Sequence, residues 1–255
     1  MKVTAFIGSP RKKNTYHAVE RLLGNLQSLG NIEYEIVMLG DYNLQRCKGC
    51  QSCLDWGEEL CSLKDDRDIL IDKIANSDGI IFASPNYSFQ VSALMKNFLD
   101  RLAFIFHRPR FFGNTFTSLV VQGIYGGGGV IKYLNFVGWG FGFNVVKGGF
   151  ITTLQPMTEK RQKANDKTID ELSKRFYAQL AKKEFPTPTL YELMTFRMGR
   201  TSRKIMLNEK YRDYTYLREK GWFESEYYYP VKLSPAKKLA GMLFDKLGVL
   251  MARVI

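Results

Sequence analysis

Five short apolar runs separated by longer helix-period segments are the feature that most constrains how this chain folds. The runs are rich in β-branched and aromatic residues and are bounded by Gly, Pro or Ser, which is typical of buried strands. The segments around them repeat apolar residues at helical spacing. The predicted strands are Lys2–Gly8, Glu33–Leu39, Gly79–Ser84, Thr117–Gly123 and Asn144–Leu154, and the predicted helices cover residues 15–29, 66–77, 91–106, 128–141 and 158–183.

This alternation predicts a parallel sheet that helices cover on both faces, because a parallel crossover usually contains a helix. Five strands in this order fit a doubly wound α/β fold with strand order 2-1-3-4-5. Ligands of that fold bind at the carboxyl ends of the strands. The loops after Gly8, Ser84 and Gly123 are therefore the candidate binding loops.

The pattern changes at residues 184–189, EFPTPT, where two prolines indicate a linker. Residues 1–185 are predicted to form the sheet domain, and residues 186–255 a helical C-terminal extension that repeats no earlier element. The helices of the extension are predicted near residues 189–207, 209–220 and 235–253.

Composition excludes several other classes of protein. Apolar residues make up 45% of the chain and charged residues 24%, which is ordinary for a folded globular protein. No stretch approaches the ~20 uninterrupted apolar residues of a membrane helix. Residues 1–8 enter a strand pattern without a signal-peptide layout, so we expect a cytoplasmic protein. The net charge of +12 is divided equally between residues 1–185 and 186–255, and no basic stripe indicates a nucleic-acid partner.

The first candidate loop, GSPRKKNT at residues 8–15, gathers hydrogen-bond donors. Ser9 and Thr15 offer hydroxyls, Asn14 an amide and Arg11 a guanidinium. Together with the backbone N–H groups at a helix N-terminus they suit a phosphate. The alternative is that Ser, Asn and Thr only cap the helix. Neither GxxxxGK[ST] nor GxGxxG is present, so a monophosphate is the phosphate class that remains.

The other two loops suit a flat ligand. Pro85 sets a turn, Asn86 and Ser88 offer polar groups to the edge of a heterocycle, and Tyr87 offers an aromatic surface. Tyr87 as an ordinary packing aromatic is the alternative. In the third loop, QGIYGGGG at residues 122–129, five glycines let backbone approach a ligand closely, although flexibility alone would also explain them.

These stretches resemble a known family. GSPRKKNT, then SPNYSFQVSALMKNFLDR from residue 84, then a Gly-rich loop after the fourth strand are similar to the flavodoxin-like NAD(P)H-dependent FMN reductase family over residues 1–180. The resemblance implies a flavodoxin-like fold, bound FMN, and NAD(P)H as a transient co-substrate. It implies that Ser9, Arg11, Asn14 and Thr15 hold the FMN phosphate, that Pro85, Asn86, Tyr87 and Ser88 border the isoalloxazine and ribityl chain, and that Gly123, Gly126 and Gly127 line its other side.

All four cysteines lie in CKGCQSCLDWGEELC, after the second predicted strand, with C-x2-C-x2-C-x7-C spacing. Such thiolates suit an iron–sulfur cluster, whereas structural zinc usually takes two separated pairs. The spacing resembles that of iron–sulfur flavoproteins, in which a cluster beside FMN passes single electrons. It also resembles CxGCxxC…C…DD stretches of flavin reductases that hold no cluster. Cys47, Cys50, Cys53 and Cys61 are thus candidate metal ligands, and the sequence fits both groups.

Three functions compete on these observations. The first is an FMN-dependent NAD(P)H oxidoreductase that passes hydride through FMN to a quinone, azo, nitro or flavin acceptor by a ping-pong scheme. The second is an iron–sulfur flavoprotein that carries single electrons. The third is a non-enzymatic flavodoxin-like interaction protein, which three intact loops disfavour. Because hydride chemistry belongs to the flavin, no residue is assigned a catalytic role.

The last predicted helix is amphipathic and basic. A basic amphipathic helix can lie on an anionic membrane, but we expect it to pack against a second subunit in a homo-oligomer, without membrane contact. Residues 221–230, GWFESEYYYP, are rich in aromatic types that are enriched at interfaces and that shape pockets. The apolar residues of the helix are Leu239, Met242, Leu243, Leu247, Leu250, Met251 and Val254, and its cations include Lys237, Lys238, Lys246 and Arg253.

Overall fold

A computed structural model describes residues 1–254, which divide into two compact units. The first unit comprises Met1–Lys48 and Leu63–Lys183. The second comprises Gly49–Ser62 and the chain from Glu184 onward. That residues 1–185 and 186–255 form two domains remains a prediction. The division adds the short stretch that carries three of the four cysteines to the second unit.

Within residues 1–254, the first unit is built on one six-stranded sheet whose paired strands all run parallel. Its order is β2-β1-β3-β4-β5, and β6 also pairs with β4. The predicted doubly wound, flavodoxin-like fold with order 2-1-3-4-5 is confirmed. The strands are β1 Lys2–Ile7, β2 Glu33–Met38, β3 Gly79–Pro85, β4 Thr115–Gln122, β5 Asn144–Val145 and β6 Gly149–Thr152.

The predicted fifth strand, residues 144–154, is two short strands because the register against β4 shifts by one residue. β5 pairs Asn144 with Thr115, whereas β6 pairs Gly149 with Leu119. Between them, the Thr117 hydroxyl donates to the Val146 carbonyl at 3.0 Å. This is the geometry of a bulge, which accommodates one extra residue. The apolar pattern of residues 144–154 does not predict this bulge.

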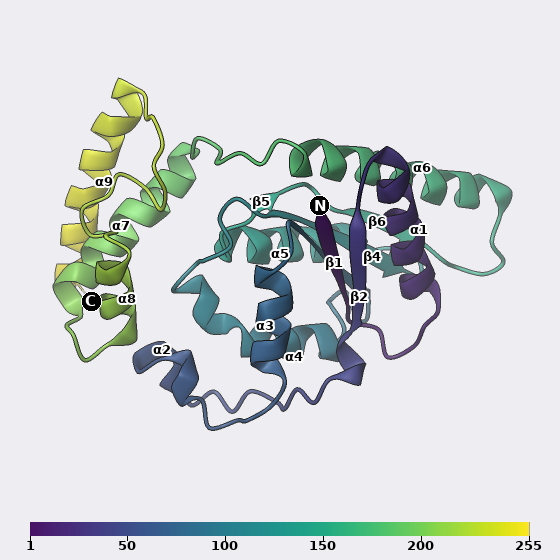
Figure 1. The fold of residues 1–255 in the computed structure, drawn as a ribbon, viewed down its shortest axis with the longest axis horizontal. Helices are drawn as coiled ribbons and strands as arrows, with labels where there is room; N and C mark the ends of the chain where they lie inside the picture. The colour runs from purple at the N-terminus through teal and green to yellow at the C-terminus, as the bar shows by residue number, and fades with distance from the viewer. Residues whose placement is uncertain (255) are drawn as a thin grey trace. The chain divides into compact units, whose positions relative to one another are not determined.

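Helices cover both faces of the sheet (Figure 1). On one face, Val3, Ala5 and Ile7 pack in a core that includes α1, Asn14–Leu29, and α6, Glu159–Leu180. On the other face, the Phe6 ring of β1 and the Phe82 ring of β3 contact the Phe98 ring of α4, and Phe82 also contacts a ring of β4. Because both faces are covered, the central strands are apolar throughout. The remaining helices of this unit are α3 Arg67–Ala75, α4 Ala93–Arg101, which a 3₁₀ turn follows at Ala103–Phe106, and α5 Gly127–Gly140.

The second unit is helical around an aromatic core. The Phe196 ring lies 4.5 Å from that of Tyr228 and 5.4 Å from that of Tyr227. Trp56 stacks on Tyr211 with ring centroids 6.1 Å apart, which joins the cysteine stretch to the extension. The three helices predicted for the extension are confirmed. The helices are α2 Ser52–Asp55, α7 Leu190–Met206, α8 Arg212–Glu219 and α9 Pro235–Val254.

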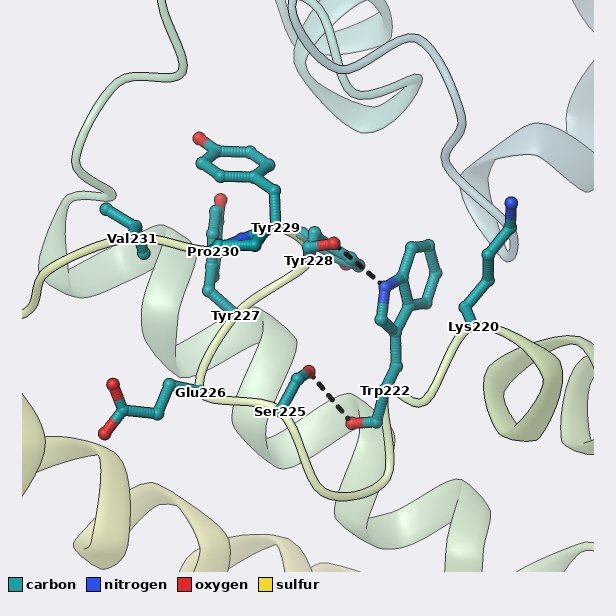
Figure 2. Close-up of a pocket in the computed structure, with 9 residues that line it drawn as sticks. All are labelled: Lys220, Trp222, Ser225, Glu226, Tyr227, Tyr228, Tyr229, Pro230 and Val231. Atoms are coloured by element: carbon teal, nitrogen blue, oxygen red, sulfur yellow. Dashed lines mark hydrogen bonds between the residues drawn. The ribbon is translucent and has the colours of Figure 1, made fainter.

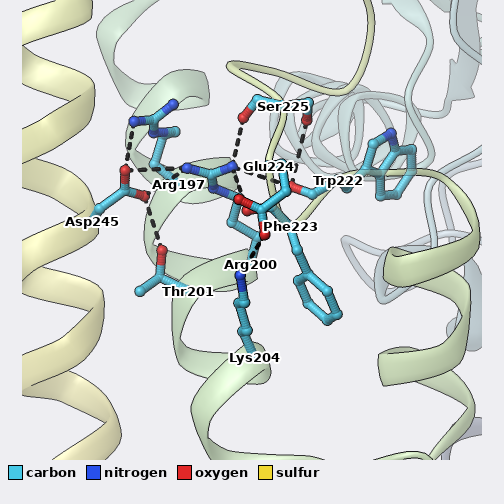
Figure 3. Close-up of polar contacts among 9 residues, drawn as sticks. All are labelled: Arg197, Arg200, Thr201, Lys204, Trp222, Phe223, Glu224, Ser225 and Asp245. Carbon is cyan, nitrogen blue, oxygen red and sulfur yellow. Dashed lines mark hydrogen bonds and ion pairs between the residues drawn. The ribbon is translucent and has the colours of Figure 1, made fainter.

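A buried polar cluster connects α7, α9 and the loop after α8 (Figure 3). Arg200 is 8% exposed, and one of its terminal nitrogens donates to the carbonyls of Trp222, Phe223 and Ser225 at 3.2, 2.9 and 2.5 Å. Its other terminal nitrogen lies 3.1 Å from both carboxylate oxygens of Asp245. Burial lowers the pKa of Arg200 below its ordinary value. The cluster fixes three segments to one another with charge-assisted hydrogen bonds.

Candidate functional site

The three candidate loops meet at one edge of the sheet. β1, β3 and β4 are neighbours and run parallel, so the loops that follow them lie at the same edge. All the predicted cofactor residues occupy the carboxyl ends of these strands or the segments directly after them. They are Ser9, Arg11, Asn14 and Thr15 after β1, Pro85, Asn86, Tyr87 and Ser88 at and after β3, and Gly123, Gly126 and Gly127 after β4.

The loop after β1 leaves the start of α1 without a side-chain cap. Lys13 is the N-cap residue of α1 and makes no side-chain cap hydrogen bond, and the first turn contains no acid. Ser9 turns back on its own loop instead: its hydroxyl donates to the Arg11 carbonyl at 2.9 Å and accepts from the Arg11 N–H at 3.3 Å. Ser9 therefore does not cap α1. The positive end of α1 remains available to an anion.

Burial differs among the four predicted phosphate residues. Ser9 and Thr15 are buried, at 6% and 4% exposure, whereas Arg11 and Asn14 are exposed. Two small hydroxyl side chains thus lie within the loop, and the longer donors are at its surface. This arrangement suits an anion that is held by backbone and hydroxyl groups from inside and by a guanidinium from outside.

Ser92 links the first loop to the second, and sequence reasoning did not select it. Its hydroxyl donates to the Gly8 carbonyl and accepts from the Met95 N–H at 3.1 Å, which caps α4. The Gly8 N–H donates to the Ala83 carbonyl at 2.8 Å. A Cβ on Gly8 would lie 2.6 Å from that of Met95, so only glycine fits. Ser92 lies inside the helix predicted for residues 91–106, whereas α4 begins at Ala93, so the prediction missed this N-cap.

The loop after β3 is a tight turn. The backbones of Tyr87 and Gln90 exchange two hydrogen bonds of 3.0 Å. Between them, Ser88 and Phe89 adopt left-handed φ values of 49° and 64°, which are strained for residues with side chains. Tyr87 is 46% exposed and so is not a core aromatic. This turn holds the polar and aromatic groups of the second loop at the edge of the sheet.

Asn86 joins the second loop to the third. Its side-chain nitrogen donates to the Tyr125 carbonyl at 2.9 Å, and its backbone N–H donates to the Val121 carbonyl at 2.8 Å. The side-chain oxygen is buried and accepts no hydrogen bond from residues 1–254. A buried acceptor without a donor costs about 1–3 kcal/mol. Asn86 is thus suited to accept a hydrogen bond from a ligand.

Gln122 shapes the glycine loop, and its place at the end of β4 was the only sign of this role in the sequence. Its side-chain oxygen accepts from the Gly127 N–H at 2.7 Å, and its side-chain nitrogen donates to the Ile124 carbonyl at 3.1 Å. Gly126 has φ of 98°, and a Cβ there would lie 2.5 Å from the Phe89 ring. Glycine at 126 is therefore required, and at Gly123 the space is open.

The four cysteines are divided between the units. Cys47 belongs to the first unit and is exposed, and the second contains exposed Cys50, partly buried Cys53 and buried Cys61. No disulfide joins them. Across residues 1–254, no group of three or more His, Cys, Asp or Glu side chains is arranged to hold a metal ion.

Two acids anchor the stretches on either side of the cysteines within the first unit. The Asp66 carboxylate accepts from the Asn43 N–H at 2.7 Å, and the Asp65 carboxylate accepts from the Gln45 N–H at 2.9 Å. Asp65 also forms a buried ion pair with Arg101 at 2.7 Å. The pair of aspartates that follows the cysteines therefore has a structural role.

The aromatic stretch 221–230 lines a cavity of the second unit of about 420 Å³ (Figure 2). Trp222 and Tyr227 are 5% and 6% exposed, and the Trp222 indole donates to the Tyr228 carbonyl at 2.9 Å. Burial raises the pKa of Tyr228 and of Tyr229 to about 12. Much of this predicted interface stretch is thus core of its own unit.

Comparison with known proteins identifies the family of this chain. The model of the NADPH-dependent FMN reductase family matches residues 1–155, which contain all three loops. Two relatives from Archaeoglobus fulgidus, each named an iron-sulfur flavoprotein, are 33% identical over 143 residues and 36% identical over 162 residues. These matches cover 56% and 58% of this chain and 69% and 71% of the relatives.

Among solved structures, RosB with the bound intermediate 8-demethyl-8-formylriboflavin-5'-phosphate has a TM-score of 0.59 to this chain. The match covers 92% of each chain at 13% sequence identity, which is a likeness of fold. The family match spans more than half of the chain and includes every loop described above. The chain therefore belongs to the NADPH-dependent FMN reductase family and is an oxidoreductase of that NAD(P)H-dependent type.

Proposed function

We propose that the chain binds FMN at the carboxyl edge of the sheet and uses it to reduce a small acceptor at the expense of NAD(P)H. The acceptor classes proposed are quinone, azo, nitro and flavin compounds. The observation that carries the proposal is the uncapped start of α1 beside the Ser9–Arg11 turn, in a chain whose family binds FMN. An anion site at a helix start is the feature that a riboflavin phosphate requires.

The residues present fit FMN at both of its ends. At the phosphate end, Ser9, Arg11, Asn14 and Thr15 would donate hydrogen bonds, and the first-turn N–H groups of α1 would add to them. At the ring end, the buried side-chain oxygen of Asn86 requires a donor, which an isoalloxazine ring N–H supplies.

The bound flavin would supply hydride acceptance from the nicotinamide and hydride donation to the acceptor. The chain's own residues bind and orient the reactants. Tyr87, Phe89, Ile124 and Tyr125 are exposed by 46–66% around the second and third loops. Exposed aromatic and aliphatic surface of this kind suits flat substrates that take turns at one place, as a ping-pong scheme requires.

Removing two phosphate donors tests the proposal. In Ser9→Ala combined with Arg11→Ala, each lost charge-assisted hydrogen bond should weaken FMN binding by about 1.5–3 kcal/mol. Lys12→Ala is the control, because the Lys12 ammonium lies 5.7 Å from the Tyr16 ring centre and is not proposed to hold the phosphate. FMN titration followed by flavin fluorescence measures both. Unchanged affinity in the folded double variant would refute the phosphate assignment.

A direct assay tests the activity. FMN-loaded protein under anaerobic conditions should oxidise about one equivalent of NADH or NADPH per bound FMN by itself, and should turn over repeatedly only when a quinone, azo, nitro or flavin compound is present in excess. Comparing the two nucleotides at equal concentration would identify the preferred one. Bound FMN without any such turnover would leave the chain a flavin-binding protein and contradict the proposed reaction.

An iron–sulfur flavoprotein that carries single electrons is the second candidate, which the names of the Archaeoglobus relatives favour. Four thiols suit iron in their chemistry. Among residues 1–254, however, the cysteines are not arranged as a metal site. Iron and acid-labile sulfide in anaerobically purified protein, lost in Cys50→Ser with FMN retained, would support this candidate. Absence of both after reconstitution would exclude it.

The homo-oligomer predicted through the C-terminal extension stays a prediction. The structure contains one chain, and the aromatic residues of 221–230 that were expected at an interface are in part buried within the second unit. Light scattering of the full-length protein would test the prediction.

A further inference from the structure

The outward side of α9 is apolar and exposed. Its large apolar side chains recur three or four positions apart and so lie on one helical face. Each is between 45% and 58% exposed, which leaves a continuous apolar strip along a helix. These residues are Leu239, Met242, Leu243, Leu247 and Leu250.

The opposite side of α9 is the one that packs on α7. A Cβ on Gly248 would lie 2.9 Å from the Met198 carbonyl, so the two helices approach closely there. Asp245 also faces α7, where Arg197, Arg200 and Thr201 bind its carboxylate (Figure 3). The contacts within the chain thus use the Gly248 and Asp245 side and leave the apolar strip uncovered.

Cations outnumber acids around the strip, and one of these cations, Lys238, is paired with Glu226 at 3.3 Å. Residues 231–255 contain five cations and one acid, and that acid is Asp245, which the arginines of α7 bind. Lys246 follows Leu243 by three residues and precedes Leu250 by four, so it projects from the same face as the strip. Within residues 1–254, Lys246 has no acidic partner. Arg253 is exposed one turn further along.

We propose that α9 docks this face on a bilayer surface that contains anionic phospholipid. Apolar side chains would enter the boundary between headgroups and acyl chains, while Lys246 and Arg253 meet phosphate groups. No helix in the described part of the chain is long and apolar enough to cross a membrane, so the docking is peripheral. A second copy fits this face less well, because pairing two such faces brings Lys246 and Arg253 close to cations of the other copy.

Vesicle sedimentation of the full-length protein tests the proposal. The protein should sediment with vesicles of phosphatidylcholine and phosphatidylglycerol, less with phosphatidylcholine alone, and less as salt is raised. Lys246→Glu should weaken binding to the anionic vesicles roughly tenfold or more. Leu243→Ser should also weaken it, because it removes part of the apolar strip.

Two matched variants serve as controls. Lys167→Glu makes the same charge change on α6, at a side chain that is 78% exposed, and Ile69→Ser removes an apolar side chain of similar exposure on α3. Neither should weaken vesicle binding as the α9 variants do. Binding that is equal on neutral vesicles, or that Lys167→Glu weakens as much as Lys246→Glu, would overturn the proposal. The proposal would also be overturned if the protein did not bind vesicles and light scattering showed an oligomer that Leu243→Ser dissociates.

Discussion

The two units differ in where they place their polar groups. In the first, the core between the sheet and helices α1 and α6 is hydrocarbon, a buried ion pair joins Asp65 to Arg101, and the candidate ligand groups stand in loops beyond the strand ends. In the second, Arg200 binds Asp245 and three backbone carbonyls, and so connects α7, α9 and the loop after α8. The candidate ligand residues of the first unit are thus distinct from the groups that stabilise it, whereas the main polar cluster of the second unit is part of its structure.

Unit size explains this difference. A smaller folded unit buries a smaller fraction of its surface, so hydrophobic burial alone stabilises it less. The second unit combines an aromatic core with charge-assisted hydrogen bonds. A buried pair of this kind is costly to break from one side, because the remaining charge keeps its desolvation penalty.

The largest expected effect is that of Arg200→Ala. Removing this guanidinium should destabilise the second unit by about 3–5 kcal/mol, because three backbone carbonyls lose their donor and Asp245 loses one of its two arginine partners. Urea unfolding followed by tryptophan fluorescence measures the change. Lys204→Ala, which removes an exposed partner of Glu224, should destabilise the second unit far less, because solvent screens that pair. If Arg200→Ala also abolished FMN binding, the separation of the two units in this comparison would be wrong.

Gly126→Ala should damage the site of the first unit while the sheet stays folded. A Cβ there meets the Phe89 ring at 2.5 Å and requires a positive φ of 98°, which together cost about 1–3 kcal/mol. The expected result is weaker FMN binding with an unchanged circular dichroism spectrum. Gly128→Ala is the control, because the space there is open and alanine favours the helix. Equal FMN affinity in both variants would contradict the role assigned to the glycine loop.

Alkaline pH should act on the second unit. Burial raises the pKa of Tyr228 to about 12, above the ordinary value of about 10. A raised tyrosine pKa stabilises the fold fully below pH 10, and this contribution is lost as pH rises toward 12. At pH 11 the loss from Tyr228 is about 1 kcal/mol. Tyrosinate absorbance measured against pH should show tyrosines that ionise well above pH 10, and Tyr228→Phe should remove one of these tyrosines. Titration of every tyrosine near pH 10 would contradict the burial of this cluster.

The smallest expected effects compare one helix cap in each unit. Thr158 caps α6 and accepts from the Arg161 N–H at 3.3 Å, and Thr189 caps α7 in a capping box with Glu192. Each change to alanine should cost about 0.5–1 kcal/mol. Hydrogen exchange should place the loss from Thr158→Ala in the first unit and that from Thr189→Ala in the second. Loss of protection spread equally over both units in either variant would show that they unfold together.

Much of the fold could be predicted because its signals are local. Apolar runs rich in β-branched and aromatic residues identified the strands, helical spacing of apolar residues identified the helices, and the alternation of the two predicted the sheet order. The shift of register between β5 and β6 could not be predicted, since it depends on the Thr117 hydroxyl reaching Val146 from the neighbouring strand. The candidate loops were found from donors and glycines that stand close together in the sequence.

The contacts that hold those loops together were not found, because the two partners of each contact are distant in sequence. Ser92 reaches Gly8 across 84 positions, and Asn86 reaches Tyr125 across 39. The place of the cysteine stretch in the fold also depends on partners that are distant in sequence. Its spacing suggested a metal site, but its membership of the second unit depends on contacts such as that of Trp56 with Tyr211.

The sequence by itself determined the elements, the doubly wound order and the three loops, since each follows from the nature and spacing of neighbouring residues. Only the tertiary structure decided which faces are covered. It turned Asp245 inward to Arg200 and left the leucines of α9 and Lys246 outward. The physical reason is that an amphipathic pattern specifies two sides of a helix, whereas the packing of the whole unit selects the side that is buried.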